Sequence, residues 1–227
     1  MTWKQAFTSS VGRKIIMSLT GIFLILFLIV HVSLNACIWA NDNGEMFNKA
    51  AYFMGQTVVM RVLEYGLFLF FIIHILQGLY LTAYDNTKRG IPYAKNYGNR
   101  GSKWYSRSMG LLGTLILLFL ILHLANFWVH TRFTGGLAEV YYDDKSYEDL
   151  YGLMKVTFSD LTIVILYVLG CISLAYHLAH GFQSAFRTLG VHHKKYLVPI
   201  VVIGNVFAIV VPFVFAMMPI SMYFGWI

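Results

Sequence analysis

Charged residues are scarce in this sequence of 227 residues. Asp, Glu, Lys and Arg make up 12% of it, whereas hydrophobic residues make up 58% and the mean hydropathy is +0.65. These values lie outside the range of an ordinary soluble domain, so we expect an integral membrane protein. The aromatic content of 17% suits a chain that places amphipathic rings at several membrane boundaries.

Cysteine is nearly absent, and so is any sign of a cleaved leader. Cys37 and Cys171 lie in or at the end of apolar runs, which argues against a disulfide framework or a cysteine metal site and leaves packing. No small-residue cleavage site follows the first apolar run at signal-peptide distance. We therefore expect an uncleaved first helix, with the N-terminus inside because Lys4, Arg13 and Lys14 precede it.

Five apolar runs are each long enough to cross a hydrocarbon core, which needs roughly 20 apolar residues. The net charge of +7 collects in particular connecting segments: 85–107 and 187–195 are basic, whereas 131–160 is acidic. This pattern indicates membrane topology rather than nucleic-acid binding, with the basic segments inside. The sequence thus predicts an all-α integral membrane protein of one membrane domain, 1–227, with its N-terminus inside and its C-terminus outside. The expected helices are approximately 15–39, 61–84, 108–129, 161–186 and 196–218.

Two further features refine this topology. Residues 41–60 are mixed and nearly neutral, which predicts an outside loop with a short amphipathic piece. Pro199 marks the expected start of the last helix, and Pro212 predicts a kink that a membrane helix tolerates.

A short sequence motif occurs in two of the apolar runs. His74 and His177 are each followed at the fourth position by a glycine, Gly78 and Gly181, and then by a large apolar residue. On an α-helix this glycine lies on the same face as the histidine and leaves room for a flat group below the imidazole. A haem needs that arrangement.

A second pair of histidines is related by duplication. Aligning Met17 with Met109 places His31 on His123, through Leu-Phe-Leu-Ile-Val-His in one copy and Leu-Phe-Leu-Ile-Leu-His in the other. Four intramembrane histidines in two matched pairs are the number required for two haems, each with an imidazole on both faces of its iron. The first four helices would then form the haem-binding bundle. Because the helices alternate in direction, we expect His31 and His123 nearer the outside than the other pair.

Histidines within a membrane can also act without binding a metal. A lone one often serves a contact between helices or a proton path. A duplicated transporter with a relay of His and Glu would also place such residues in its helices. Two bis-histidine haems account more economically for parallel positions on four of five helices.

His180 competes with His177 for the ligand role, because it lies one turn further along the same helix. We prefer His177, since its glycine at the fourth position repeats the context of His74. We expect the remaining histidines to be solvated or surface groups rather than metal ligands; they are His130, His192 and His193.

The chain resembles the five-helix, di-haem cytochrome b membrane anchor of succinate:quinone oxidoreductases, the family of succinate dehydrogenases and fumarate reductases. The likeness covers essentially the whole chain in length, helix number, orientation and histidine placement. In that family the fourth-helix ligand has a glycine at the fourth position, which again selects His177. The residues that carry the likeness are Ser18 to His31, His74 with Gly78, Gly113 to His123, and His177 to Gly181 continuing to Gly190.

This resemblance implies two haems b, an outer one held by His31 and His123 and an inner one held by His74 and His177. It also implies a flavoprotein subunit and an iron-sulfur subunit, which dock on the cytoplasmic side of a prokaryotic membrane and hold the dicarboxylate site. Electrons would pass from succinate through flavin and iron-sulfur clusters to the inner haem, the outer haem and a quinone. The basic segment from Lys88 to Arg107 is the expected docking surface. The complex could also form a higher oligomer.

Some polar residues are candidates for the haem pockets and the quinone site. Ser18 and Arg107, near the inner ends of the first and third helices, and Arg187 are candidates for the inner haem propionates, with interface anchoring the alternative for both arginines. Quinone chemistry needs a proton donor or acceptor beside the ring carbonyls. Glu64, with Arg61 one turn before it, is the candidate, and an ordinary salt bridge between them is the competing interpretation.

One departure from the family bears on direction. Some di-haem fumarate reductase anchors carry a membrane-embedded Glu two residues before the fourth-helix ligand, where this chain has Ala175. The difference favours succinate oxidation with a menaquinone-type acceptor over a fumarate reductase anchor running in reverse.

A di-haem cytochrome b of a hydrogenase or formate dehydrogenase would keep the haems and change the partner. A haem-free transporter or structural anchor would lack a haem spectrum.

Overall fold

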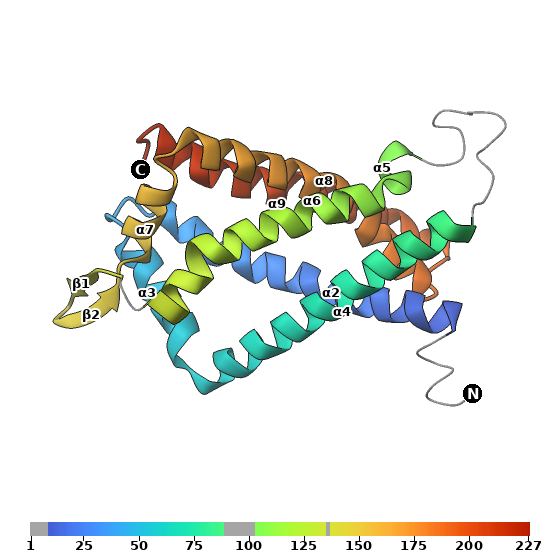
Figure 1. The fold of residues 1–227 in the computed structure, drawn as a ribbon, viewed down its shortest axis with the longest axis horizontal. Helices are drawn as coiled ribbons and strands as arrows, with labels where there is room; N and C mark the ends of the chain where they lie inside the picture. Colours follow the sequence, from blue (N-terminus) through green and yellow to red (C-terminus); the bar gives the residue numbers. More distant parts are fainter. Residues whose placement is uncertain (1–8, 89–102, 135–136) are drawn as a thin grey trace.

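A bundle of long helices dominates the computed structural model, which describes residues 9–88, 103–134 and 137–227 (Figure 1). Most of the expected docking segment, 88–107, lies outside these residues. Five helical spans are long and apolar enough to cross a membrane, in agreement with the number predicted from the sequence. The chain is therefore a multi-pass helical membrane protein. Its long helices are α2 (Ser10–Asn35), α4 (Val58–Lys88), α6 (Met109–His123), α8 (Leu161–Thr188) and α9 (Lys194–Tyr223).

The helices α2 and α8 each begin at a polar side chain that accepts a hydrogen bond from a free backbone N–H group. Ser9 Oγ accepts a hydrogen bond from the backbone N–H of Gly12 at 3.0 Å, before α2. Asp160 accepts one from the backbone N–H of Thr162 at 2.7 Å, before α8. Such N-caps stabilise a helix start by about 1 kcal/mol, so these starts are encoded locally.

The last helix contains prolines that a soluble helix rarely accepts. Pro199 lies near the start of α9, which begins at Lys194, two residues before the start expected from the sequence. Pro212 and Pro219 lie further along the same helix. Membrane helices tolerate such prolines because neighbouring groups satisfy the freed backbone carbonyls.

The third membrane helix departs from α geometry near its end. Its α-helical part stops at His123, and two π-helical stretches follow, η2 (Leu124–Trp128) and η3 (His130–Thr134). The apolar span continues to Phe133, four residues beyond the expected end. Because a π-helical turn is wider than an α-helical one, it changes which side chains face the neighbouring helices.

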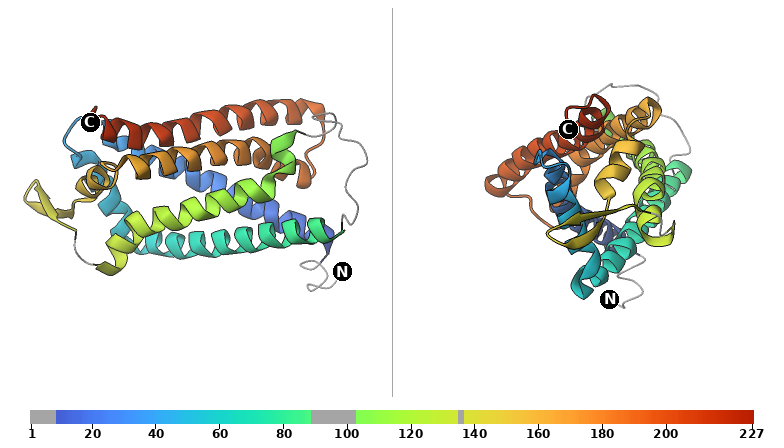
Figure 2. Two further views of the ribbon diagram at one scale, coloured as in Figure 1. Left: turned by 45° about the horizontal axis from the view of Figure 1, so that its top comes forward. Right: turned by 90° about the vertical axis from the view of Figure 1, so that its left-hand side faces the viewer.

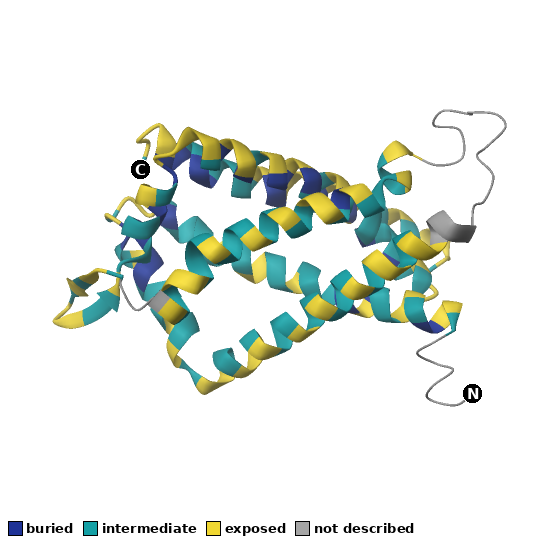
Figure 3. Ribbon diagram, viewed as in Figure 1, coloured by how far each residue is buried: buried dark blue, intermediate teal, exposed yellow. Residues whose placement is uncertain are grey.

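The bundle presents its apolar side chains outward as well as inward. α8 packs against α2, α6 and α9, and the five helices run alongside one another in both views of Figure 2. Exposed positions recur along their length (Figure 3), and many of them carry large apolar residues, among them Leu111, 63% exposed, and Phe213, 62% exposed. An apolar surface of this extent is what lipid chains cover.

A second layer, which we call the cap, covers one end of the bundle. The sequence predicted a short amphipathic piece there, and a helix is found, but a hairpin and a further helix stand where only a loop was expected. The two strands pair antiparallel, with Tyr142 opposite Lys145. The cap consists of η1 (Ala36–Trp39), α3 (Glu45–Gln56), β1 (Glu139–Tyr142), β2 (Lys145–Glu148) and α7 (Leu150–Thr157).

Asn48 of α3 holds the parts of the cap together. Its side chain donates to Tyr142 Oη at 3.3 Å and to Asp149 Oδ1 at 3.2 Å, and it accepts from the backbone N–H of Tyr151 at 2.9 Å. With only 1% of its surface exposed, Asn48 needs these partners, because a buried amide without them is costly.

The opposite end of the bundle carries cations, and we call it the basic end. α2, α6 and α9 begin there, and a short helix, α5 (Trp104–Arg107), leads into α6. The start of α2 and the C-terminus lie at opposite ends of the bundle (Figure 1). This asymmetry agrees with an N-terminus inside the cell, although the orientation itself stays a prediction. The described cations of the basic end are Arg13, Lys14, Lys103, Arg107, Arg187, Lys194 and Lys195.

Candidate functional site: two facing pairs of histidines

The structure brings the four intramembrane histidines together in two pairs, each formed across two helices. His31 of α2 faces His123 of α6, with 5.8 Å between ring centroids and 87° between ring planes. His74 of α4 faces His177 of α8, with 6.2 Å between centroids and 67° between planes. These are the pairs expected from the sequence. We call the first the outer pair, on the side of the cap, and the second the inner pair, on the side of the basic end.

The spacing within each pair fits one metal between two rings. Imidazoles bound to a metal from opposite sides place their centroids about 6 Å apart, since each metal to nitrogen bond is about 2 Å long. Among the residues that the structure describes, no three or more His, Cys, Asp or Glu side chains gather as they do around a bare metal ion. Each pair therefore presents two imidazoles to the space between two helices.

The ring nitrogens differ in their hydrogen bonds. Thr20 Oγ1 lies 3.1 Å from His74 Nδ1, and Asn35 Nδ2 lies 3.3 Å from His31 Nδ1. Neither His123 Nδ1 nor His177 Nδ1, both buried, has a partner among the described residues. Buried ring nitrogens without partners are rare in folded proteins, and both of these belong to histidines of α6 and α8.

Two glycines lie close to the rings of the inner pair. A Cβ on Gly21 would lie 3.6 Å from His74 Cε1, and one on Gly113 would lie 3.9 Å from His177 Cε1. The two glycines that were singled out from the sequence behave differently. A Cβ on Gly181 would meet nothing within 4 Å, whereas one on Gly78 would lie 3.7 Å from Met17 Cε. Gly21 and Gly113 could have been found from the duplication, which aligns them.

Aromatic rings surround the outer pair. Phe27 stacks on His31 with 5.0 Å between centroids, and Phe119 stacks on His123 with 5.8 Å. Phe215 of α9 lies 5.4 Å from the ring of His31, so the fifth helix also lines this region. Such rings exclude water and lower the local dielectric.

The competing histidines lie elsewhere. His180 is half-buried one turn further along α8, whereas the ring that faces His74 belongs to His177. His193 Nδ1 accepts a hydrogen bond from the backbone N–H of Lys195 at 3.2 Å and caps the start of α9. His130 and His192 are exposed, as expected.

The propionate candidates lie at the basic end of the bundle. Ser18 is 4% exposed, and its hydroxyl donates to the Lys14 carbonyl at 2.9 Å. The side chains of Arg107 and Arg187 are exposed, which suits either a propionate contact or anchoring at the interface. Their role stays a prediction.

Glu64 lies in a network larger than the predicted salt bridge. Arg61 Nη1 lies 3.2 Å from Glu64 Oε2, as the competing interpretation required. Two residues that were not predicted also bind the carboxylate: Trp128 Nε1 donates to Oε1 at 2.7 Å, and Arg132 Nη2 donates to Oε2 at 3.0 Å. The π-helical end of the third helix supplies both. Glu64 is therefore a well-held anion at the cap side of the bundle.

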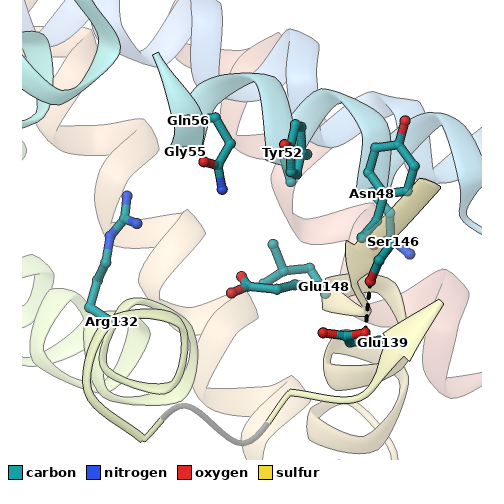
Figure 4. Close-up of a pocket in the computed structure, with 11 residues that line it drawn as sticks. Asn48, Tyr52, Gly55, Gln56, Arg132, Glu139, Ser146 and Glu148 are labelled. Atoms are coloured by element: carbon teal, nitrogen blue, oxygen red, sulfur yellow. Dashed lines mark hydrogen bonds between the residues drawn. The ribbon is translucent and has the colours of Figure 1, made fainter. Parts of the chain in front are cut away.

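Arg132 also lines a cavity of about 210 Å³ between α3, η3 and the hairpin. In Figure 4, Arg132 and Glu139 lie on opposite sides of this cavity, with Glu148 between them. Tyr52 and Tyr147 contribute aromatic walls. The cavity thus joins the cap to the Glu64 network through the guanidinium of Arg132.

The fold and the site define a class of protein: a multi-pass helical membrane protein with two facing pairs of histidines between its helices. No protein-family model matches the chain, and neither a curated protein nor a solved structure matches it.

Proposed function

We propose that this chain is the membrane-anchor cytochrome b subunit of a succinate:quinone oxidoreductase, and that it carries electrons between an iron-sulfur subunit and a membrane quinone. The observation that supports the proposal most is the pairing of His31 with His123 and of His74 with His177 across four helices. Two such pairs at different depths suit two haems in series.

Each group of residues would have its own role in haem binding. His31 and His123 would hold the outer haem b, and His74 and His177 the inner one, and the lack of side chains at Gly21 and Gly113 would let the macrocycle approach the inner rings. When bound, each haem would accept and release one electron at a time. The protein orients the four imidazoles, keeps water away with apolar and aromatic side chains, and places cations at the basic end for propionates.

The basic end is the proposed docking side for the flavoprotein and iron-sulfur subunits, which would hold the dicarboxylate site on the cytoplasmic side of a prokaryotic membrane. Its cations on several helices support that choice, because the positive-inside rule places them in the cytoplasm. Succinate oxidation with a menaquinone-type acceptor remains the preferred direction, given Ala175. A hydrogenase or formate dehydrogenase cytochrome, or an anchor working in the fumarate-reducing direction, is the alternative.

Glu64 and Arg61 remain the candidates for the quinone site, and Arg132 joins them. The carboxylate lies at the cap side, where the outer pair is found, and it already accepts hydrogen bonds from three side chains. A quinone carbonyl would find charged donors there. Such a site would lie on the far side of the bundle from the proposed soluble subunits.

A haem count on purified protein tests the proposal. The wild type should give a reduced minus oxidised spectrum of b type and two haems per chain by pyridine haemochrome. His177→Ala should lose one haem, whereas the matched variant His180→Ala, one turn away on α8, should keep both. A folded preparation without haem would reject the electron-transfer function and favour a transporter or a cofactor-free anchor.

The partner needs a separate measurement. Mild purification of the chain from its native membrane should bring along a flavoprotein and an iron-sulfur protein, and the complex should reduce a quinone with succinate. Recovery of hydrogenase or formate dehydrogenase subunits instead would keep the haems and reject the succinate assignment.

A further inference from the structure

A hydroxyl group contacts the inner pair on one side only. Thr20 of α2 is 3% exposed, and its Oγ1 lies 2.8 Å from the Ile16 carbonyl, 3.1 Å from the Met17 carbonyl and 3.1 Å from His74 Nδ1. A hydroxyl has one proton and two lone pairs. Since the carbonyls can only accept, the proton points to them and the oxygen is left to accept a hydrogen bond from His74 Nδ1–H.

This direction determines where the imidazole carries its proton. A neutral imidazole has one N–H, so a proton at Nδ1 leaves the lone pair of Nε2 free for a metal. We propose that Thr20 is a positioning residue, which holds His74 as the Nδ1–H tautomer and raises its basicity as an axial ligand. The effect on the iron rests on the proposed function, whereas the tautomer does not.

The back-bond from hydroxyl to helix carbonyl is not what distinguishes Thr20. Ser18, Thr82 and Thr114 make the same kind of bond, each to the carbonyl four residues earlier. Only Thr20, among these four, also touches an imidazole. The neighbouring residue, Gly21, lets the His74 ring approach α2 closely.

The second half of the bundle lacks this contact. The duplication that aligns Gly21 with Gly113 also aligns Thr20 with Leu112. Leu112 is 5% exposed and offers no acceptor, and His177 Nδ1 has no partner among the described residues. The two facing imidazoles are therefore inequivalent: His74 is held by a hydrogen bond and His177 by packing alone.

Two measurements on the full chain test the inference. Nitrogen-15 NMR of labelled histidines, with His74→Gln used to assign the signal, should show His74 as the Nδ1–H tautomer in haem-free protein. Thr20→Val keeps the shape and removes the acceptor, so this preference should be lost, and Thr20→Ser should restore it. A His74 that carries its proton on Nε2 in the wild type would overturn the inference.

The second measurement is a redox titration of the haem-loaded protein. Losing the hydrogen bond lowers the basicity of the ligand and favours ferrous iron. At a fixed ambient potential, Thr20→Val should raise the ferrous to ferric ratio of the inner haem roughly three- to tenfold. The outer haem should not change. Leu112→Thr, which copies the hydroxyl into the second half, should shift the inner haem in the opposite direction.

Thr114→Val is the matched control, because it removes a back-bonded hydroxyl from an exposed position on α6, and it should alter neither readout. A chain with no haem but with the expected tautomers would reject the proposed function and keep the role of Thr20. Two haems with unchanged potentials and tautomers in Thr20→Val would reject the role of Thr20 and keep the function.

Discussion

The bundle has two halves, α2 with α4 and α6 with α8. They place their histidines and phenylalanines alike but orient the imidazoles by different contacts. In both halves a phenylalanine stacks on the histidine four residues later, Phe27 on His31 and Phe119 on His123. In the first half, Nδ1 of each histidine also has a polar neighbour. In the second half neither Nδ1 has one among the described residues. The two halves thus share the positions of their imidazole and phenylalanine rings. They differ in the hydrogen bonds made by Nδ1 of their histidines.

A second comparison concerns the polar residue ten positions before the histidine of α4 and of α8. These residues are Glu64 and Tyr167. Both reach the π-helical end of the third helix: Glu64 binds Trp128 and Arg132, and Asn126 donates to Tyr167 Oη at 3.2 Å. The two halves therefore hold the same segment, one by an ion pair and an indole hydrogen bond and the other by a neutral hydrogen bond.

Filling the space in front of the inner rings should have the largest effect. Gly21→Leu and Gly113→Leu each place a side chain at a position where a Cβ alone would lie 3.6 Å or 3.9 Å from an imidazole. We expect either variant to lose about half of the bound haem, since one of two sites is blocked. A pyridine haemochrome count with a spectrum of the remaining haem checks this. If only one of the two variants loses haem, the two halves of the bundle contribute unequally to haem binding.

Gly170→Ala should disturb the second half alone. A Cβ on Gly170 would lie 2.5 Å from Phe119 Cδ2, so the ring that stacks on His123 must move. Overpacking of this kind costs about 1–3 kcal/mol, measurable by thermal or denaturant unfolding in detergent. Gly66→Ala on α4 is the control, because its Cβ meets nothing within 4 Å, and it should not destabilise the protein.

The two contacts to the third helix should differ in strength. Tyr167→Phe removes one neutral hydrogen bond and should cost about 0.5–1.5 kcal/mol. Glu64→Gln leaves Arg132 without its anion and should cost about 1–3 kcal/mol, because the side chains of Glu64 and Arg132 are only 18% and 27% exposed. Unfolding midpoints of the two variants test the order. Equal costs would mean that the ion pairs contribute no more than the neutral bond.

The long helices could be predicted because a membrane leaves an apolar run few alternatives to a helix. The pairing of His31 with His123 followed from the duplication and from helices that alternate in direction. The partners of Glu64 on the third helix could not be predicted: Trp128 and Arg132 are 64 and 68 residues away, and the π-helical turns set which way they face.

Within the cap, the short amphipathic helix was predicted, but the hairpin and α7 were missed for a different reason. Asn48 binds residues about a hundred positions away, such as Tyr151, and no local pattern shows such contacts. The hairpin did leave a signal, because Asp143 and Asp144 stand between Tyr142 of one strand and Tyr147 of the other. Both have positive φ, 50° and 59°, as a tight hairpin turn requires, and Asp tolerates that conformation.

The smallest expected effect comes from a contact that joins the two halves through the cap. Lys49 of α3 lies 2.6 Å from Glu45 on its own helix and 2.6 Å from Asp143 in the hairpin turn. Hydrogen bonds to Asp143 and then to Glu45 raise the pKa of Lys49 above its ordinary value. A raised pKa stabilises the fold while the amine is charged, so this contribution is complete below about pH 10 and is lost as the pH rises further.

Thermal unfolding of the wild type and of Lys49→Met, followed from about pH 8 to about pH 12, measures this contribution. The difference between their unfolding temperatures should be small and constant at the lower end, because exposed ion pairs contribute little. It should shrink at the upper end, where Lys49 loses its charge. Lys145→Met, which removes a cap lysine that lies over the Tyr52 ring rather than between two carboxylates, should not show the same convergence. A constant difference up to the highest pH would mean that Lys49 joins the halves by packing alone and that its charge does not hold the cap.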